Sequence, residues 1–116
     1  MLYVPGMATV LTLQQRKQAR VEAIRAGFAL LREELADYGR RDGGRFWVYG
    51  SAATGRLHYE SDIDILADFD EARVSAALDF VERRASELGL KADVQPKAWC
   101  TEEFLARISE SALVLP

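Results

Sequence analysis

Residues 46–69 read FWVYGSAATGRLHYESDIDILADF. This stretch starts with a short aromatic and β-branched run, Phe46–Tyr49, and ends with Asp62–Phe69, in which polar and apolar residues alternate. Both runs are typical of β-strands. The Gly50-Ser51 pair follows the first run directly, where a sharp turn brings backbone amides and a hydroxyl close to an anion such as a phosphate. The stretch therefore predicts two strands joined by a ligand-binding loop.

Helical patterns lie on both sides of this stretch. From Thr12 to Arg41, apolar residues recur every three or four positions, and Thr12 and Gln15 have the spacing of a capping box. The Asp42-Gly43-Gly44 cluster is expected to stop this helix. A second helix is predicted from Glu71 to Leu88, with Asp70 as its N-cap and a glycine after its last turn.

The C-terminal part predicts one more strand and one more helix. The strand runs from Leu90 to about Gln95, and a helix that opens at Thr101-Glu102-Glu103 continues to Ala112. The order helix, strand, short helix, strand, helix, strand, helix predicts an α/β (α+β) fold, a small mixed sheet of about three strands covered by helices. A chain of 116 residues fits one domain, 1–116, with an N-terminal helix at 12–41 and a core at 45–112.

Composition excludes several classes of protein. The formal net charge of −3 lacks the excess of cations on which nucleic-acid binding depends, so we expect no direct nucleic-acid partner. One cysteine, Cys100, cannot form an internal disulfide, and the single His58 rules out a histidine-rich metal site. No long uncharged apolar stretch occurs. We expect a cytoplasmic protein from a reducing compartment, without a membrane segment.

Carboxylates are placed where they can share metal ions. On a strand, Asp62 and Asp64 project from the same face ~6.5 Å apart, and oxygen-only ligation suits Mg²⁺ or Mn²⁺. Two such ions stabilise the attacking and the leaving oxygen in nucleotidyl transfer. Asp93, in an otherwise apolar strand, is expected to join Asp62 on one metal and to help deprotonate an attacking hydroxyl. Asp68 has the same parity, but it lies near the strand end and is expected to stay outside the site.

These residues carry a resemblance. Gly50-Ser51, ten intervening residues and Asp62-Ile63-Asp64, with Asp93 on a later strand, resemble the nucleotidyltransferase superfamily that includes DNA polymerase beta, and within it the minimal nucleotidyltransferases, or MNT proteins. The resemblance covers roughly residues 46–112. It implies a polymerase beta-like fold with a long N-terminal helix and a Mg²⁺-dependent reaction that takes ATP as substrate.

The resemblance also implies roles for individual residues. Gly50 and Ser51 would contact the β- and γ-phosphates of the nucleotide, and Asp62, Asp64 and Asp93 would be the catalytic carboxylates that hold two Mg²⁺ ions. Gly55 and Ser61 complete the nucleotide-binding motif. Many relatives place arginines inside the Gly-Ser loop, where this chain has Ala52, Ala53 and Thr54. Arg56 or a partner would then have to neutralise the triphosphate.

A partner protein is part of what the resemblance implies. MNT proteins of this size are commonly the antitoxin of a HEPN-MNT toxin-antitoxin pair, which neutralises the HEPN RNase by transferring AMP from ATP to one of its tyrosines. Length supports a partner independently, because no residues remain to build a second domain for the acceptor. The alternative is a non-catalytic antitoxin that occludes its toxin and keeps a vestigial nucleotide site. A small-molecule nucleotidyltransferase of the aminoglycoside-modifying kind would need a pocket domain.

The long N-terminal helix has two interpretations. It covers the core, or it also docks a partner or a second copy. Its polar face carries Arg16, Lys17, Arg20 and Arg25, and basic charge near a helix N-terminus opposes the helix dipole. One hypothesis is that this charge attracts an acidic partner surface or the phosphates of ATP.

Overall fold

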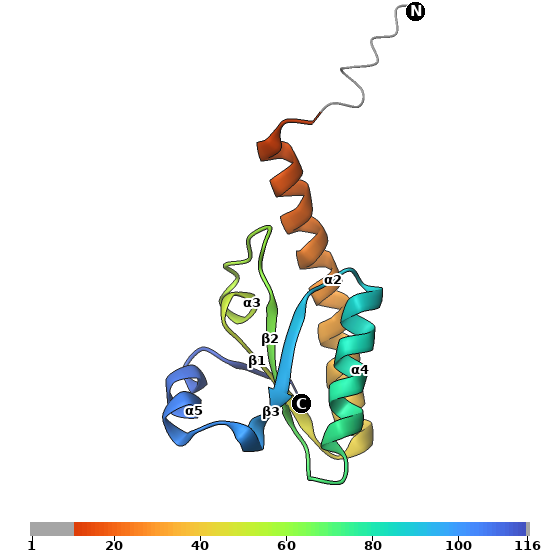
Figure 1. The fold of residues 1–116 in the computed structure, drawn as a ribbon, viewed down its shortest axis with the longest axis vertical. Coiled ribbons are helices and arrows are strands. Elements are labelled where there is room, and N and C mark those ends of the chain that lie inside the picture. The colour runs from red at the N-terminus through yellow and green to blue at the C-terminus, as the bar shows by residue number, and fades with distance from the viewer. Residues whose placement is uncertain (1–10, 116) are drawn as a thin grey trace, which may run out of the picture.

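A four-stranded mixed sheet, in the order β3-β2-β1-β4, forms the centre of the molecule (Figure 1). The structure is a computed structural model that describes residues 11–115. Strand β1 (Arg45–Tyr49) pairs antiparallel with β2 (Ile63–Asp68) and with β4 (Leu113–Leu115). Strand β3 (Ala92–Pro96) pairs in parallel with β2. The mixed α/β fold expected from the sequence is confirmed.

Strand β4 corrects the expected number of strands from about three to four. The last helix, α5 (Glu102–Ser109), ends before Ala112, and residues 113–115 form an edge strand on β1. Three residues are too few to show an alternating pattern, although Leu115 is buried and Val114 is 41% exposed. Pairing with a strand that lies far away in the sequence therefore decides the structure of this segment.

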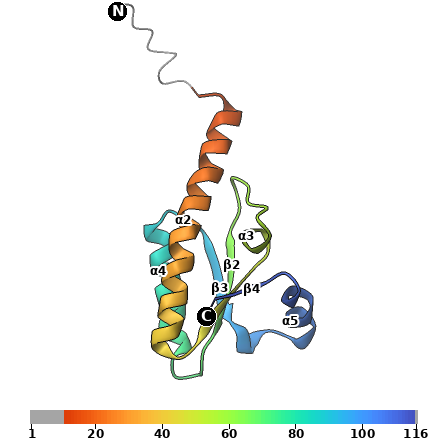
Figure 2. The ribbon, with the colours of Figure 1, turned by 180° about the vertical axis from the view of Figure 1, so that it is seen from behind.

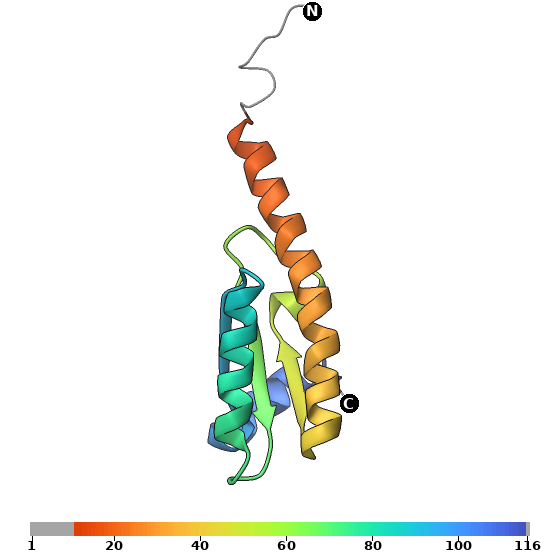
Figure 3. The same ribbon diagram turned by 90° about the vertical axis from the view of Figure 1, so that its right-hand side faces the viewer.

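Helices cover the two faces of the sheet unequally. Helices α2 (Leu13–Asp42) and α4 (Val74–Glu87) lie side by side on one face (Figure 3). The short α3 (Ser51–Thr54) and α5 lie on the other side of the sheet, as the front and back views show (Figures 1 and 2). A 3-10 turn, η1 (Lys97–Trp99), leads from β3 towards α5.

The ends of the long helices follow from local capping. Thr12 and Gln15 form the expected capping box, with each side chain bonded to the other residue's backbone N–H. Gly43 ends α2 in the left-handed conformation, at φ 72°. Helix α4 begins at Val74 instead of Glu71, and its N-cap is Arg73 instead of the predicted Asp70. Residues 71–73 form a turn, in which the Asp70 side chain accepts a hydrogen bond from the N–H of Arg73.

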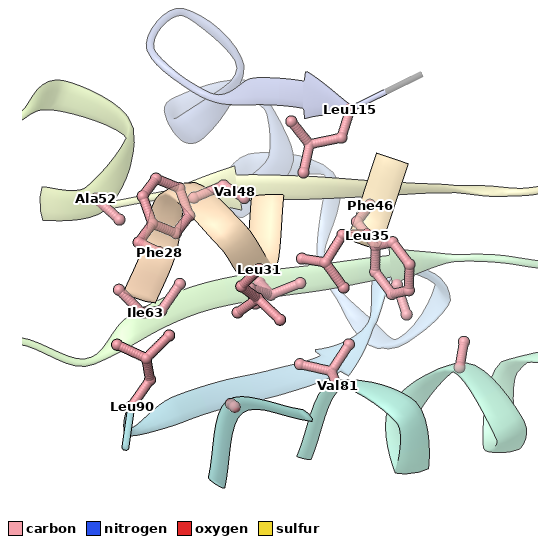
Figure 4. Packing of buried hydrophobic residues seen from close by; sticks show 14 of the residues in the cluster. Phe28, Leu31, Leu35, Phe46, Val48, Ala52, Ile63, Val81, Leu90 and Leu115 are labelled. Atoms are coloured by element: carbon pink, nitrogen blue, oxygen red, sulfur yellow. The ribbon is translucent and has the colours of Figure 1, made fainter. Parts of the chain in front are cut away.

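The hydrophobic core lies between the sheet and the α2–α4 layer (Figure 4). Each fully buried Leu, Ile or Phe side chain contributes roughly 1.5 to 3 kcal/mol to folding. An ion pair joins the two helices at the edge of this core, where Arg84 Nε lies 2.7 and 2.9 Å from the two carboxylate oxygens of Glu34. The buried side chains of largest volume are Phe46, Ile24, Leu31, Leu35, Ile63, Ile65, Leu66, Val48 and Val81.

The N-terminal part of α2 extends beyond the sheet (Figures 1 and 3). Ile24 is the first buried residue of the helix, and residues 11–20 are exposed except for the half-buried Lys17. No helix within residues 11–115 has the length and apolar character that a membrane crossing requires.

Candidate active site

Strands β2 and β3 bring two carboxylates side by side. Because these strands are parallel and in register, Asp64 lies directly opposite Asp93. The residues next to Asp64, Ile63 and Ile65, are fully buried against the helical layer, so Asp64 faces the other side of the sheet. Asp64 is half-buried and Asp93 is exposed. The sequence could not supply this register, because nothing in it specifies which residue of β3 meets which residue of β2.

Asp62 lies just before the start of β2 and is exposed. Burial raises the pKa of Asp64, and the nearby charges of Asp93 and then Asp62 raise it further. Both of the other predicted carboxylates therefore lie close enough to act electrostatically on Asp64 at this end of the sheet. The sequence predicts that Asp93 and Asp62 share one metal ion. The register places Asp93 level with Asp64, and the sharing of an ion by Asp93 and Asp62 stays a prediction.

Gly50 places the loop backbone against the Asp64 carboxylate. It adopts φ 72° and ψ −150°, a region that is essentially confined to glycine. A Cβ at this position would lie 2.5 Å from Asp64 Oδ2. Two independent features therefore require glycine at position 50: the backbone conformation and the closeness of the Asp64 carboxylate.

Ser51 and Ser61 connect the two ends of the loop. Ser61 is 7% exposed, and its Oγ accepts a hydrogen bond from the backbone N–H of His58 at 2.7 Å. Ser51 Oγ lies 3.5 Å from Ser61 Oγ and is half-buried. Gly55 ends α3 at φ 75°, and its N–H donates to the carbonyl of Ser51. Direct contact of Gly50, Ser51, Gly55 and Ser61 with a nucleotide stays a prediction.

The structure explains the lack of an arginine at position 52, whereas Thr54 is exposed and nothing in the structure explains the lack of one there. Ala52 is only 6% exposed and belongs to the hydrophobic core, and Ala53 packs against that core. A guanidinium at position 52 would have to be buried without a partner. Arg56, one residue beyond α3, is exposed. Any cation that neutralises a triphosphate must come from Arg56 or from outside this loop.

Tyr49 and Gln95 also lie beside the carboxylates, and Gln95 was not among the residues predicted from the sequence. Tyr49 lies opposite Asp64 in the β1–β2 register. Burial raises the pKa of Tyr49, a hydrogen bond with the Gln95 side chain lowers it, and Asp64 and Asp93 raise it again. Phe104 of α5 packs edge-on against the Tyr49 ring, with the centroids 5.4 Å apart. The sequence did contain a signal for Gln95: it lies two residues after Asp93 on the same strand, and such residues project from the same face of a sheet.

Three other residues lie outside this cluster, as expected. Asp68 is at the far end of β2, where it accepts a hydrogen bond from Trp47 Nε1 at 3.3 Å and lies 3.9 Å from Lys97 Nζ. His58 is an exposed loop residue. Cys100 is half-buried, and burial raises the pKa of its thiol, which disfavours a nucleophilic thiolate.

The donor set suits a hard divalent cation, but the side chains are not gathered around one point. Carboxylate oxygens are the ligands that Mg²⁺ and Mn²⁺ prefer, and the raised pKa of Asp64 shows that a positive charge there would relieve repulsion. Within residues 11–115, no three His, Cys, Asp or Glu side chains lie close enough to hold one ion together. Asp64 and Asp93 would form the base of a metal site, and Asp62 would have to turn towards them.

One known protein family is similar to this chain over most of its length. The sequence profile of a family described as "Nucleotidyltransferase domain" matches residues 29–113, from the middle of α2 to β4. The chain belongs to this nucleotidyltransferase family. No curated protein matches it at a significant level.

A solved structure of a candidate minimal nucleotidyltransferase has the same fold as this chain. The similarity has a TM-score of 0.62 and 22% sequence identity, and it covers 77% of this chain and 93% of the other. The polymerase beta-like fold with a long N-terminal helix, expected from the Gly-Ser and Asp-x-Asp motifs, is confirmed. General nucleotidyl transfer is the activity that the family assigns to the chain.

Proposed function

We propose that this nucleotidyltransferase transfers AMP from ATP to a tyrosine of a HEPN-family RNase toxin and acts as its antitoxin. The observation that carries the catalytic part of the proposal is the Asp64–Asp93 register with the Gly50 backbone held against the Asp64 carboxylate. Asp62 at the entry to β2 completes the carboxylate set, and Mg²⁺ suits those oxygens best. Bound Mg²⁺ would polarise the phosphates of ATP and offset their charge.

The chain's own residues then have separate tasks. The loop of Gly50 and Ser51 holds the β- and γ-phosphates, and Asp93 accepts the proton of the acceptor hydroxyl. The hydroxyl oxygen forms a bond to the α-phosphorus of ATP while the bond from that phosphorus to the β-phosphate oxygen breaks. Pyrophosphate leaves with the displaced electron pair, and the acceptor keeps AMP as a phosphodiester.

A protein acceptor is supported by the exposure of the carboxylates. Asp62 and Asp93 are exposed, and Asp64 is half-buried. Two cavities lie elsewhere: one of about 450 Å³ beside Asp68 and Phe69 at the far end of β2, and one of about 530 Å³ between α2 and β4. The end of the sheet that carries the carboxylates is therefore open to an acceptor that brings its own surface.

The proposal is tested by purifying the chain with the product of its neighbouring gene and weighing both proteins by intact mass spectrometry after addition of ATP and Mg²⁺. We expect one or more AMP units on the partner, lost in Asp62→Ala and Asp64→Ala. Asp68→Ala is the matched control, because this carboxylate lies on the same strand and face but is bound to Trp47 and Lys97. A partner of unchanged mass would contradict the catalytic proposal.

The second candidate is an antitoxin that neutralises its toxin by occlusion. The burial of Ala52, which leaves the loop without the arginines common in relatives, favours weak nucleotide binding. An RNase that is bound and inhibited equally by the wild type and by Asp64→Ala, with no AMP attached, would establish this alternative.

Asp93→Ala separates binding from transfer. Because Asp93 is exposed and is assigned to the acceptor proton, we expect ATP to bind the variant while transfer falls at least about a hundredfold. Equal losses of ATP binding and transfer would mean that Asp93 acts mainly through the metal.

A further inference from the structure

The N-terminal part of α2 stands over the end of the sheet that holds the carboxylates. We call residues 11–20 the projecting segment; all except Lys17 are exposed, and the segment extends past the sheet (Figures 1 and 3). Lys17 Nζ lies 4.6 Å from the ring centroid of Tyr59, in the loop that leads into Asp62. Arg20 Nη2 donates a hydrogen bond of 2.9 Å to the carbonyl of Gly89, in the turn that leads into β3. The segment therefore contacts both loops that precede the carboxylate-bearing strands.

The charge of the projecting segment is opposite to that of the chain. It contains Arg16, Lys17 and Arg20 and no acidic residue, in a protein of net charge −3. Within residues 11–115, no ion pair joins these three cations to a carboxylate. Cations at this end of a helix also oppose the helix dipole. Neither the core nor local ion pairing accounts for the three charges.

We propose that the projecting segment is a docking surface for an acidic region of the protein that carries the acceptor hydroxyl. The inference rests on the proposed function in one respect, that the acceptor is a protein. A protein that presents a hydroxyl to Asp93 from the open end of the sheet comes next to this segment. The cations there, the exposed Arg16 and Arg20 and the half-buried Lys17, attract acidic side chains. Leu11 and Leu13, 47% and 68% exposed, add apolar contact area.

Nucleic acid fits this end of the molecule less well. A phosphate backbone is charged along its whole length, so a strand that lies on the three cations would also face the exposed carboxylates of Glu60, Asp62 and Asp93 at the same end, which repel it. An acidic protein surface can place its side chains on the three cations and still leave the carboxylates free for metal ions.

The first test measures binding without catalysis. The probe is a fluorescein-labelled copolymer of glutamate and tyrosine, and fluorescence anisotropy reports its affinity in the absence of ATP. We expect the triple variant R16E/K17E/R20E to bind the copolymer at least about tenfold more weakly than the wild type. A lysine–tyrosine copolymer should show the reverse preference. Unchanged affinity for the glutamate–tyrosine copolymer overturns the proposal.

A matched control distinguishes the effect of charge reversal in the projecting segment from the effect of the change in net charge. The variant R32E/R45E/R107E makes the same change in net charge at three other exposed arginines, outside the projecting segment. We expect its affinity for the copolymer to fall by less than about twofold. Arg16 has no contact in the structure to lose, so the single variant Arg16→Glu should weaken binding without a lower Tm, which excludes misfolding as the cause. An equal loss in the control triple variant overturns the proposal.

Further readouts identify the occupant and keep the proposal distinct from the proposed function. Three results would assign the segment to another occupant. The wild type could bind a poly(U) RNA more tightly than the copolymer. R16E/K17E/R20E could lose as much affinity for ATP–Mg²⁺ as for the copolymer, or a homodimer of the wild type could dissociate in this variant. If the copolymer binds through the segment but receives no AMP, the docking proposal is supported and the proposed enzymatic function is contradicted. If the wild type and R16E/K17E/R20E transfer AMP to the copolymer at the same rate, the enzymatic function is supported and the docking proposal is contradicted.

Discussion

Gly50 decides how closely the loop backbone approaches the carboxylates. The sequence predicted a sharp turn here, because a Gly-Ser pair follows a strand. It could not predict the second reason for glycine, the Asp64 carboxylate that occupies the space of a side chain. That contact depends on the antiparallel register of β1 and β2, which joins residues far apart in the chain.

Gly50→Ala should therefore impair both folding and transfer. We expect a loss of about 1 to 3 kcal/mol in the free energy of unfolding, because alanine is strained at this φ and ψ. We also expect AMP transfer to fall at least about a hundredfold, since the new Cβ displaces Asp64. Urea denaturation and a transfer assay measure the two effects.

Gly89→Ala is the matched control for this prediction. Gly89 also has a positive φ, 71°, but nothing lies within 4 Å of an added Cβ. We expect it to lose about 1 to 2 kcal/mol of stability and to keep its transfer rate. A Gly50→Ala protein as active as Gly89→Ala would show that the position of Asp64 does not depend on this glycine.

Ser61 and Ser51 were predicted together as nucleotide-binding residues, but their environments differ. Ser61→Ala removes the buried acceptor of the His58 N–H, so we expect a loss of about 1 to 3 kcal/mol in unfolding free energy. Ser51→Ala should cost less stability and weaken ATP binding more, because its hydroxyl has only one long contact, at 3.5 Å. Thermal unfolding and ATP titration of both variants compare them, and equal stability losses would contradict this assignment.

At the scale of elements, α2 is one helix with two environments. Its C-terminal part packs Ile24, Phe28, Leu31 and Leu35 into the core. Residues 11–20, in contrast, contact the loops before β2 and β3 through Lys17 and Arg20. The periodic pattern predicted the whole helix and its capping box, because both are local. It could not show where the body of the protein ends, and the exposure of residues 11–20 came only from the structure.

Amide hydrogen exchange should divide α2 at about Ile24. Amides in the projecting segment should exchange at least about a hundredfold faster than those of residues 28–39, because helical hydrogen bonds without tertiary packing open readily. Exchange followed by mass spectrometry or NMR measures the difference. Uniform protection along α2 in the isolated chain would mean that the segment is already covered, for instance by a second copy.

At the scale of the whole molecule, the carboxylate cluster costs stability until a cation neutralises it. Asp64 and Asp93 face each other directly, and like charges in register on neighbouring strands destabilise a sheet. The pKa of Asp64 is raised by its burial and by its acidic neighbours, so the folded state holds a proton there more readily than the unfolded chain does. This contribution therefore destabilises the metal-free fold above the folded-state pKa, and the destabilisation fades as the pH falls through it.

Asp64→Asn should stabilise the metal-free protein and abolish transfer. We expect a gain of about 0.5 kcal/mol in unfolding free energy, which is about 2 to 4 °C in Tm. Mg²⁺ should raise the Tm of the wild type, because it binds the folded state alone, and should leave that of Asp64→Asn nearly unchanged. Differential scanning calorimetry with and without MgCl₂ tests both points, and an equal response of the two proteins to Mg²⁺ would place the metal elsewhere.

The sequence by itself determined the local features of this protein: the periodicity of α2 and α4, the capping box at Thr12, the turn at Gly50 and the Gly-Ser and Asp-x-Asp spacing typical of nucleotidyltransferases. Each depends on residues within a few positions of one another, so a pattern records it. Tertiary structure alone decided the edge strand β4, the register that sets Asp93 opposite Asp64, the core position of Ala52 and the overhang of α2 at the carboxylates. These features follow from strand register and from packing between distant segments. Both are determined by the free energy of the whole folded chain, to which no single local pattern corresponds.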